Sequence, residues 1–228
     1  MALTVEKLSK MIDHTLLKID CTYKEIENIC SDAINYNFAS VAVNPSNIAL
    51  SKEILKGSSV KICTAIGFYL GSYPSDIKKY EITDAVEKGA DELDMLINIS
   101  ALKEKKYDVI TEEVKSLVSL ANGKVTKVIL ETCYLDNDEI IIACKIARDN
   151  KADFVKTSTG FGTHGAMVEH VKLMRKTVGE DMGVKAAGGI SSVEYALELI
   201  KAGANRIGTS SSVKIIESFI SNRKKTDT

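Results

Sequence analysis

The segment NKADFVKTSTGFG, residues 150–162, runs from the end of a predicted helix through a short apolar strand into a loop of small and hydroxyl residues. Lys156 lies inside that strand, although an ammonium group is costly to bury without a partner. The same order recurs in VKAAGGI, residues 184–190, where Lys185 is followed by alanine and glycine. Both lysines therefore belong to one recurring unit of strand and ligand-facing loop.

Short β-branched segments alternate with helix-length segments along the whole chain. Three predicted helices end in similar sequences, KGADELDM (88–95), NKADFVKT (150–157) and AGANRIGT (202–209), each with a small turn, then Asp or Asn, then a strand. The units recur roughly every 25 to 30 residues, which suits successive strand–helix pairs and is too short for separate domains. We predict eight strands, at residues 11–17, 40–43, 61–66, 92–96, 126–130, 154–156, 183–186 and 206–208.

Eight such pairs favour an α/β fold, a closed parallel (β/α)8 TIM barrel that forms a single domain over residues 1–220. An open doubly wound sheet is the alternative, but no strand leads into a helix through the GxGxxG turn of dinucleotide-binding sheets. The last residues, 221–228, are too polar to pack, and we expect a frayed tail there. Two helix starts match the capping box, Thr22 with Glu25 and Ser191 with Glu194.

The composition argues against several classes of protein. With 228 residues, a formal net charge of -1, no tryptophan and 6% aromatic residues, the chain has neither a basic surface nor stacking platforms for nucleic acid. No apolar segment approaches the ~18 residues of a membrane span, and no secretory signal is evident, so we expect a cytoplasmic protein without a membrane partner. The five cysteines and three histidines lack metal-ligand spacing, so we expect no metal and no other cofactor.

In parallel barrels the loops at the carboxyl ends of the strands form the active site. Polar residues are expected there from separate strands: Asp13, Asn44, Thr64, Asp94, Glu131, Lys156, Lys185 and Gly208. Strands six and seven should be neighbours about 5 Å apart, which brings the two ammonium groups together in a partly dry pocket. Burial and like charge then lower the pKa of one lysine, which becomes a free amine able to attack a carbonyl.

The residues alone do not say which lysine is the nucleophile. The alternative is that Asp94 or Glu131 neutralises each lysine in a purely structural network.

Two glycine-rich loops indicate where the other end of the ligand lies. Gly188 and Gly189 follow strand seven, and Gly208 with Ser210 and Ser211 follow strand eight, ahead of the last helix. Barrels commonly bind phosphate at this place, because bare amide groups and a helix N-terminus meet an anion there. Loops of this kind on consecutive strands predict a phosphorylated carbonyl substrate.

Eight segments between Asp13 and Ser212 resemble a known family, the deoxyribose-phosphate aldolases. They are DHTLL (13–17), VNP (43–45), IGF (66–68), ELDMLINI (92–99), ETCYL (131–135), FVKTSTGFG (154–162), GVKAAGGI (183–190) and RIGTS (206–210). The resemblance implies a class I aldolase of barrel fold that reversibly cleaves 2-deoxy-D-ribose 5-phosphate to acetaldehyde and D-glyceraldehyde 3-phosphate. It further implies a lysine Schiff base without a metal, a role in deoxynucleoside catabolism, and a homodimer or homotetramer.

The resemblance also implies a role for each matching residue. Lys156 would form the Schiff base, Lys185 would lower its pKa and Asp94 would relay protons; the choice of Lys156 over Lys185 rests on the resemblance. The residues implied to line the substrate pocket are Asp13, Thr15 and Thr159, and those implied to hold the phosphate, largely through backbone amides, are Gly188, Gly189, Gly208, Ser210 and Ser211.

The chain departs from the family pattern around the phosphate. Phe161 stands where some members carry a lysine that helps to hold phosphate, and Ser191 stands where an arginine is frequent. Two other functions compete with the aldolase reading: another phosphosugar barrel enzyme, such as a transaldolase, and a catalytically silent sugar-phosphate-binding protein. The first would need a ketose donor, and the second would show no turnover.

Overall fold

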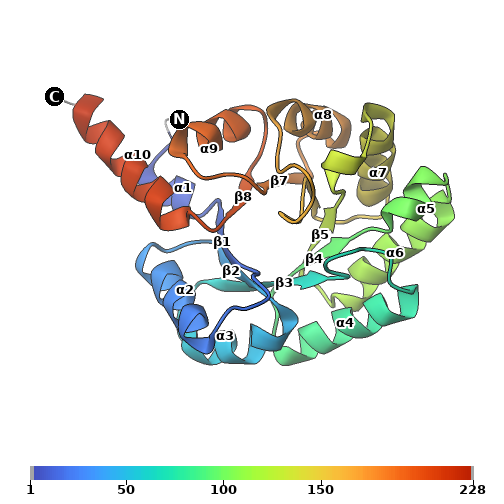
Figure 1. Ribbon diagram of the computed structural model, residues 1–228, viewed down its shortest axis with the longest axis horizontal. Coiled ribbons are helices and arrows are strands. Elements are labelled where there is room, and N and C mark those ends of the chain that lie inside the picture. The colour runs from blue at the N-terminus through green and yellow to red at the C-terminus, as the bar shows by residue number, and fades with distance from the viewer. Residues whose placement is uncertain (1–2, 227–228) are drawn as a thin grey trace.

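The structure is a computed structural model that describes residues 3–226, and its eight parallel strands close into a barrel in chain order (Figure 1). The strands agree with the predicted ranges to within one residue: β1 (Ile12–Leu16), β2 (Ser40–Val43), β3 (Lys61–Ile66), β4 (Glu92–Leu96), β5 (Val125–Ile129), β6 (Phe154–Lys156), β7 (Gly183–Ala187) and β8 (Arg206–Thr209). Strand β8 pairs with β1, with His14 opposite Thr209. The sheet therefore has no edge, which confirms the barrel and excludes the open sheet.

Helices form a ring outside the strands, as Figure 1 shows. They are α1 (Val5–Ser9), α2 (Tyr23–Asn35), α3 (Ile48–Ile54), α4 (Ser75–Lys88), α5 (Ile99–Lys103), α6 (Tyr107–Leu120), α7 (Asn137–Asp149), α8 (Val168–Val178), α9 (Val193–Lys201) and α10 (Ser212–Thr226), with short 3-10 turns η1 (Pro45–Asn47) and η2 (Thr132–Tyr134). The capping box of Thr22 with Glu25 is confirmed at α2. At α9 the prediction is wrong by one residue, because Ser192 rather than Ser191 accepts the hydrogen bond from the Tyr195 amide.

The repeated Asp or Asn before three strands has a structural cause. Each of these side chains accepts a hydrogen bond from the first part of the preceding strand. The pairs are Asp91 with the Ile62 amide (3.1 Å), Asp153 with the Thr126 amide (2.8 Å) and Asn205 with the Val184 amide (2.8 Å). Because each bond joins neighbouring strands at one rim, the repeat fixes the register in which the barrel closes.

An aromatic ring, that of Phe154, lies inside the barrel at the start of β6. Phe154 begins β6 opposite Gly183, and a Cβ atom at Gly183 would lie 2.2 Å from the Phe154 ring, so the ring occupies the space that glycine leaves. The Arg206 guanidinium lies 5.4 Å from the centre of that ring. Phe154 therefore points inward, and the alternation of side chains directs Lys156 inward as well.

Helix α10 continues to Thr226, into the segment for which we expected a frayed tail. The segment contains neither glycine nor proline, and Arg223 both donates to the Leu3 carbonyl (3.2 Å) and lies 5.8 Å from the Phe219 ring centre. A helix end needs no apolar burial when nothing breaks its backbone hydrogen bonds. Residues 227 and 228 of the expected tail lie outside the described part.

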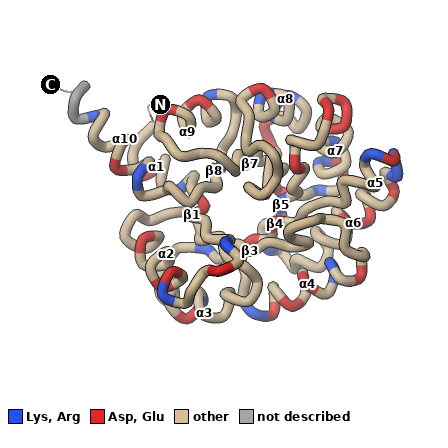
Figure 2. Tube along the Cα trace, viewed as in Figure 1, with Lys and Arg blue, Asp and Glu red and all other residues tan. Residues whose placement is uncertain are grey.

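The outer surface carries charges of both signs, interspersed along the ring of helices (Figure 2). None of the helices within residues 3–226 has the length and apolar character needed to cross a membrane.

Candidate active site

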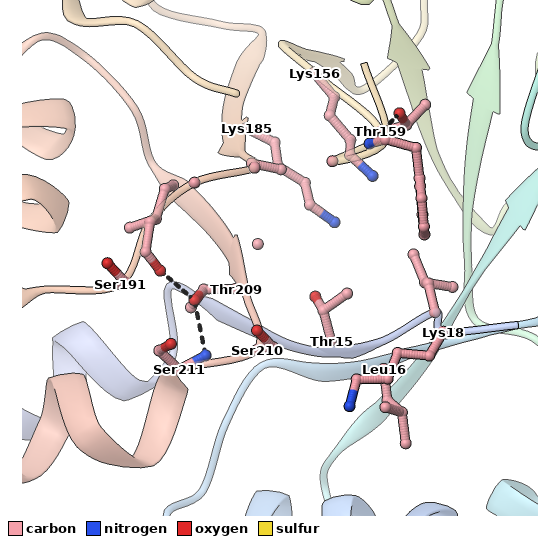
Figure 3. Close-up of a pocket in the computed structure, with 18 residues that line it drawn as sticks. Thr15, Leu16, Lys18, Lys156, Thr159, Lys185, Ser191, Thr209, Ser210 and Ser211 are labelled. Atoms are coloured by element: carbon pink, nitrogen blue, oxygen red, sulfur yellow. Dashed lines mark hydrogen bonds between the residues drawn. The ribbon is translucent and has the colours of Figure 1, made fainter. Parts of the chain in front are cut away.

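A cavity of about 350 Å³ lies at the carboxyl ends of the strands, where the sequence predicted the site (Figure 3). Nine of the predicted site residues line it: Thr15, Lys156, Thr159, Lys185, Gly188, Gly189, Gly208, Ser210 and Ser211. In Figure 3 the side chains of Lys156 and Lys185 extend from neighbouring strands into the same space, with Ser210 and Ser211 across from Thr159. Of the residues to which the resemblance gave a role, Asp13 and Asp94 do not line the cavity; both are buried and contact the lysines from inside the barrel.

Asp94 joins the two lysines through one oxygen atom. Its Oδ2 lies 2.8 Å from the Nζ of Lys156 and 2.7 Å from the Nζ of Lys185. All three side chains are at most 4% exposed. The neighbouring positions of the lysines on β6 and β7 were predicted from the sequence, and their common contact with one carboxylate follows from the closure of the barrel.

Two further cations were missed by the sequence analysis. Lys127 on β5 is fully buried and lies 2.7 Å from Asp94 Oδ1 and 2.6 Å from Glu92. Arg206 at the start of β8 contacts Asp13 at 2.6 Å and Glu92 at 3.1 Å. Lys127 in VTKVI also lies within an apolar strand, as Lys156 does, but no loop of small residues follows it directly.

The charges inside the barrel do not balance when every group is ionised. Three carboxylates form these ion pairs, and four cationic side chains meet them within the described chain: Asp13, Glu92 and Asp94 with Lys127, Lys156, Lys185 and Arg206. A buried site carries an uncompensated charge only at high cost, so one cation is expected to lose its proton.

Lys156 is the cation whose proton is held least firmly. Burial lowers the pKa of Lys156, the Asp94 carboxylate opposes this, and the nearby Lys185 lowers the pKa further. Burial acts on the pKa of Lys185 in the same direction, but Asp13 and Asp94 outweigh it and raise that pKa. The pKa of Lys127 is likewise raised by Asp94 against burial. The structure thus separates two lysines that sequence reasoning left equivalent.

Glu131, which one alternative had neutralising a lysine, forms no ion pair with a lysine within residues 3–226, although its charge interacts with Lys156 at longer range. Its carboxylate instead accepts the Thr159 amide, with N–O distances of 3.2 and 3.1 Å, and its pKa is raised by burial. Glu131 therefore supports the loop after β6, while Asp94 alone meets both lysines of the cavity.

The loops after β7 and β8 form the opposite wall. Gly188 and Gly189 have φ of 89° and 73°, a conformation that residues with a side chain rarely adopt. The Thr209 hydroxyl donates to the Ile190 carbonyl and accepts the Ser211 amide at 2.9 Å, as the dashed lines in Figure 3 mark. The Ser211 amide is thus engaged within the loop, which leaves its hydroxyl as the group that can meet a ligand.

The departures from the family pattern also lie at this cavity. Phe161 is 48% exposed and packs edge-on against Tyr69, with ring centres 4.5 Å apart. Phe161 and Ser191 line the cavity, as does Lys18, an exposed lysine after β1 that the sequence analysis did not select. Ser210 and Ser211 form a serine loop directly after β8. Since β1 pairs with β8, Lys18 follows the strand that neighbours the one leading into this serine loop.

One cluster has the residue types of a metal site, but its possible ligands are paired with cations or protonated. Ligand atoms of Asp13, Cys63 and Glu92 lie within 4.8 Å of one another. Both carboxylates are already paired with cationic side chains, and burial followed by the Asp94 charge raises the pKa of the Cys63 thiol to about 12. A metal needs deprotonated ligands free of competing cations, so this cluster does not fit one.

Comparisons with known proteins show to which family the chain belongs. Residues 7–217 match the family described as DeoC/LacD family aldolase. The chain is 53% identical over 217 residues to the deoxyribose-phosphate aldolase of Clostridium perfringens (strain SM101 / Type A), covering 95% of this chain and 97% of that protein. It is 54% identical over 211 residues to the deoxyribose-phosphate aldolase of Streptococcus sanguinis (strain SK36), covering 92% and 96%.

Solved structures give the same result. A putative deoxyribose-phosphate aldolase from Coccidioides immitis superposes with a TM-score of 0.93 at 38% identity, covering 95% of this chain and 87% of that one. The deoxyribose phosphate aldolase from Aeropyrum pernix, described as a unique tetrameric structure, superposes with a TM-score of 0.89 at 37% identity, covering 96% and 93%. With its barrel, its cavity and these relatives taken together, the chain belongs to the DeoC/LacD family of aldolases.

Proposed function

We propose that this protein is a deoxyribose-phosphate aldolase that reversibly cleaves 2-deoxy-D-ribose 5-phosphate to D-glyceraldehyde 3-phosphate and acetaldehyde. One observation carries the proposal: Lys156, whose pKa is lowered, faces a cavity and shares the Asp94 carboxylate with a second lysine whose pKa is raised. Imine formation requires an unprotonated amine as nucleophile and, next to it, a protonated group that can act as general acid.

The Nζ of Lys156 attacks the C1 aldehyde of the open-chain sugar, and the carbinolamine loses water to give an iminium ion. Lys185 and Asp94 lie within hydrogen-bonding distance of this centre and supply the proton that the departing hydroxide needs. The iminium ion then acts as an electron sink for the next bond to break.

Cleavage breaks the bond between C2 and C3. The C3 hydroxyl gives up its proton to the Asp94–Lys185 pair, its oxygen forms the aldehyde of glyceraldehyde 3-phosphate, and the bonding electrons form an enamine on C1 and C2. The pair returns a proton to C2, and water releases acetaldehyde from Lys156. Because Asp94 and Lys185 share this proton, they titrate as a coupled acid and base.

We assign the phosphate to the wall made by Gly188, Gly189, Gly208, Ser210 and Ser211. Positive φ values at the glycine pair and the start of α10 support this, since both present amide groups to an anion. Thr15 and Thr159 lie nearer the lysines and are suited to the sugar hydroxyls. With Phe161 and Ser191 uncharged, Lys18 is the exposed cation available at the rim.

The test is borohydride trapping with 2-deoxyribose 5-phosphate, followed by peptide mass analysis. We expect a reduced two-carbon or five-carbon adduct on Lys156, together with release of acetaldehyde by the untreated enzyme. An adduct on another lysine would overturn the assignment of the nucleophile. No adduct and no acetaldehyde from folded protein would overturn the aldolase function in favour of a silent binding protein.

We also propose that the chain assembles with copies of itself. The Aeropyrum pernix relative is described as tetrameric. On α4 and the segment before it, four large apolar side chains lie in the open, with Leu70 71%, Tyr73 36%, Ile77 47% and Tyr80 70% exposed. Light scattering after size exclusion should give a dimer or tetramer, and Tyr80→Glu should weaken it; a monomer at all concentrations would refute the proposal.

A further inference from the structure

A buried series of hydrogen bonds, from His14 through Ser212 to Thr209, lies next to the serine loop proposed to hold the phosphate. His14 on β1 has its Nδ1 2.9 Å from the hydroxyl of Ser212, the first residue of α10. Ser212 is fully buried, and His14 is 7% exposed. Neither side chain lines the cavity, and neither takes part in the proposed mechanism. The pair therefore needs a separate explanation.

The donors and acceptors in this series can be assigned. The Ser212 hydroxyl has one hydrogen, which it donates to the Thr209 carbonyl at 3.0 Å. Its oxygen accepts from His14 when the imidazole carries a hydrogen on Nδ1. The second ring nitrogen, Nε2, faces a carboxylate oxygen of Asp32 on α2 at 3.8 Å. Contacts at both ring nitrogens thus hold the His14 ring in one orientation.

The Ser212 and Thr209 contacts determine the shape of the turn between β8 and α10. The Thr209 carbonyl accepts a hydrogen bond from the Ser212 hydroxyl. The Thr209 hydroxyl accepts from the Ser211 amide and donates to the Ile190 carbonyl of the loop after β7. Ser210 and Ser211 lie between these fixed points. Both loops proposed to hold the phosphate are therefore connected to His14 through one continuous set of hydrogen bonds.

We propose that His14 is a positioning residue for phosphate, which acts through Ser212 to hold the β8–α10 turn and the glycine loop in the geometry that binds an anion. The inference rests on the proposed function for the identity of the phosphorylated substrate. Backbone groups bind an anion well only when they are fixed before it arrives. Loss of the Nδ1–Ser212 bond should therefore weaken phosphate binding without altering the lysine chemistry.

The test compares two substrates that differ only in the phosphate. In Ser212→Ala and His14→Leu, we expect KM for 2-deoxyribose 5-phosphate to rise about tenfold, the upper end of what one buried hydrogen bond contributes, with kcat little changed. Cleavage of 2-deoxyribose should change far less. His14→Asn should recover most of the affinity, because its side-chain amide can donate from the position of Nδ1. Inhibition of 2-deoxyribose cleavage by inorganic phosphate should weaken in the same two variants and by a similar factor.

Asp136→Ala is the matched control, because it removes the cap of α7, on the far side of the barrel from β1, at a similar cost in stability. Equal losses for both substrates in Ser212→Ala, or an unchanged KM and phosphate inhibition, would overturn the inference while leaving the aldolase function intact. If His14→Leu does not fold, Ser212→Ala decides. If the wild-type chain does not cleave the phosphosugar, the proposed function fails separately, and calorimetric titration with inorganic phosphate still compares the variants.

Discussion

Replacing Lys127 with methionine should raise the pKa of Lys156, although Lys127 is fully buried and does not line the cavity. Lys127 binds Asp94 Oδ1 at 2.7 Å and Lys156 binds Oδ2 of the same carboxylate at 2.8 Å. Lys127 repels a proton on Lys156 and also offsets part of the Asp94 charge. Without Lys127, both effects favour the ammonium form of Lys156, and less free amine is present at neutral pH.

The magnitude follows from the geometry of the shared carboxylate. Two ammonium groups on its two oxygens are separated by roughly 6 Å, and at an effective dielectric constant of about 20 their repulsion is about 3 kcal/mol. Each 1.4 kcal/mol is a factor of ten, so kcat/KM at pH 7 should fall by up to about 100-fold. Because the loss reflects protonation and not a missing contact, it should diminish as the pH rises.

The assay is the pH profile of kcat/KM for cleavage of 2-deoxyribose 5-phosphate, with the rate of imine trapping measured in parallel. The acid limb should move to higher pH in Lys127→Met. Lys78→Met is the matched control, because Lys78 is also a buried lysine paired with a carboxylate, Glu113 at 2.7 Å, but lies outside the barrel interior. Both variants should lose a few kcal/mol of stability. A folded Lys127→Met enzyme with an unmoved acid limb would refute the charge argument.

Three further outcomes follow from the same structure. Lys156→Ala should abolish imine formation, whereas Lys185→Leu should leave a folded protein whose imine forms slowly at neutral pH; equal and substantial activity in both would contradict the proposed roles. Lys18→Met should raise KM for the phosphorylated substrate up to about fivefold at low salt and leave 2-deoxyribose unaffected, with the exposed Lys24→Met as control. Cys63, buried and with its pKa raised to about 12, should resist iodoacetamide in the native protein, and rapid labelling located by mass analysis would show that the interior opens.

The strands were predictable because their signals are local. A β-branched segment, a small turn and an Asp or Asn recur before β4, β6 and β8, and the structure uses each of those side chains to tie a strand to its predecessor. The helix starts were less certain, since Ser191 and Ser192 offer the same hydroxyl and only the extended backbone of Ser192 decides between them. The polar composition of residues 221–228 predicted a tail, whereas the structure continues α10 to Thr226, where no glycine or proline interrupts the helix.

The residues of the candidate site were predictable in part, because the residues that follow them in the sequence gave a signal. Lys156 and Lys185 were found because small-residue loops follow them, whereas Lys127 is followed by apolar residues and drew no attention. Arg206 was missed because its partners, Asp13 and Glu92, lie far away in sequence and come within reach only across the closed barrel. The aromatic contact of Phe161 with Tyr69 likewise joins loops after β6 and β3 that no local pattern relates.

Closure of the barrel also decides which lysine is the free amine. Lys185 pairs with two carboxylates, Asp94 and Asp13, whereas the ion pair of Lys156 within residues 3–226 is with the Asp94 oxygen that it shares with Lys185. Asp13 belongs to β1, which the ring brings near β7 only because β1 pairs with β8. In an open sheet that ended at β8 without this pairing, the two lysines would have equivalent partners and would compete for one proton. In the proposed mechanism, the pairing of β1 with β8 therefore distinguishes Lys156 from Lys185, because it brings the Asp13 carboxylate to Lys185.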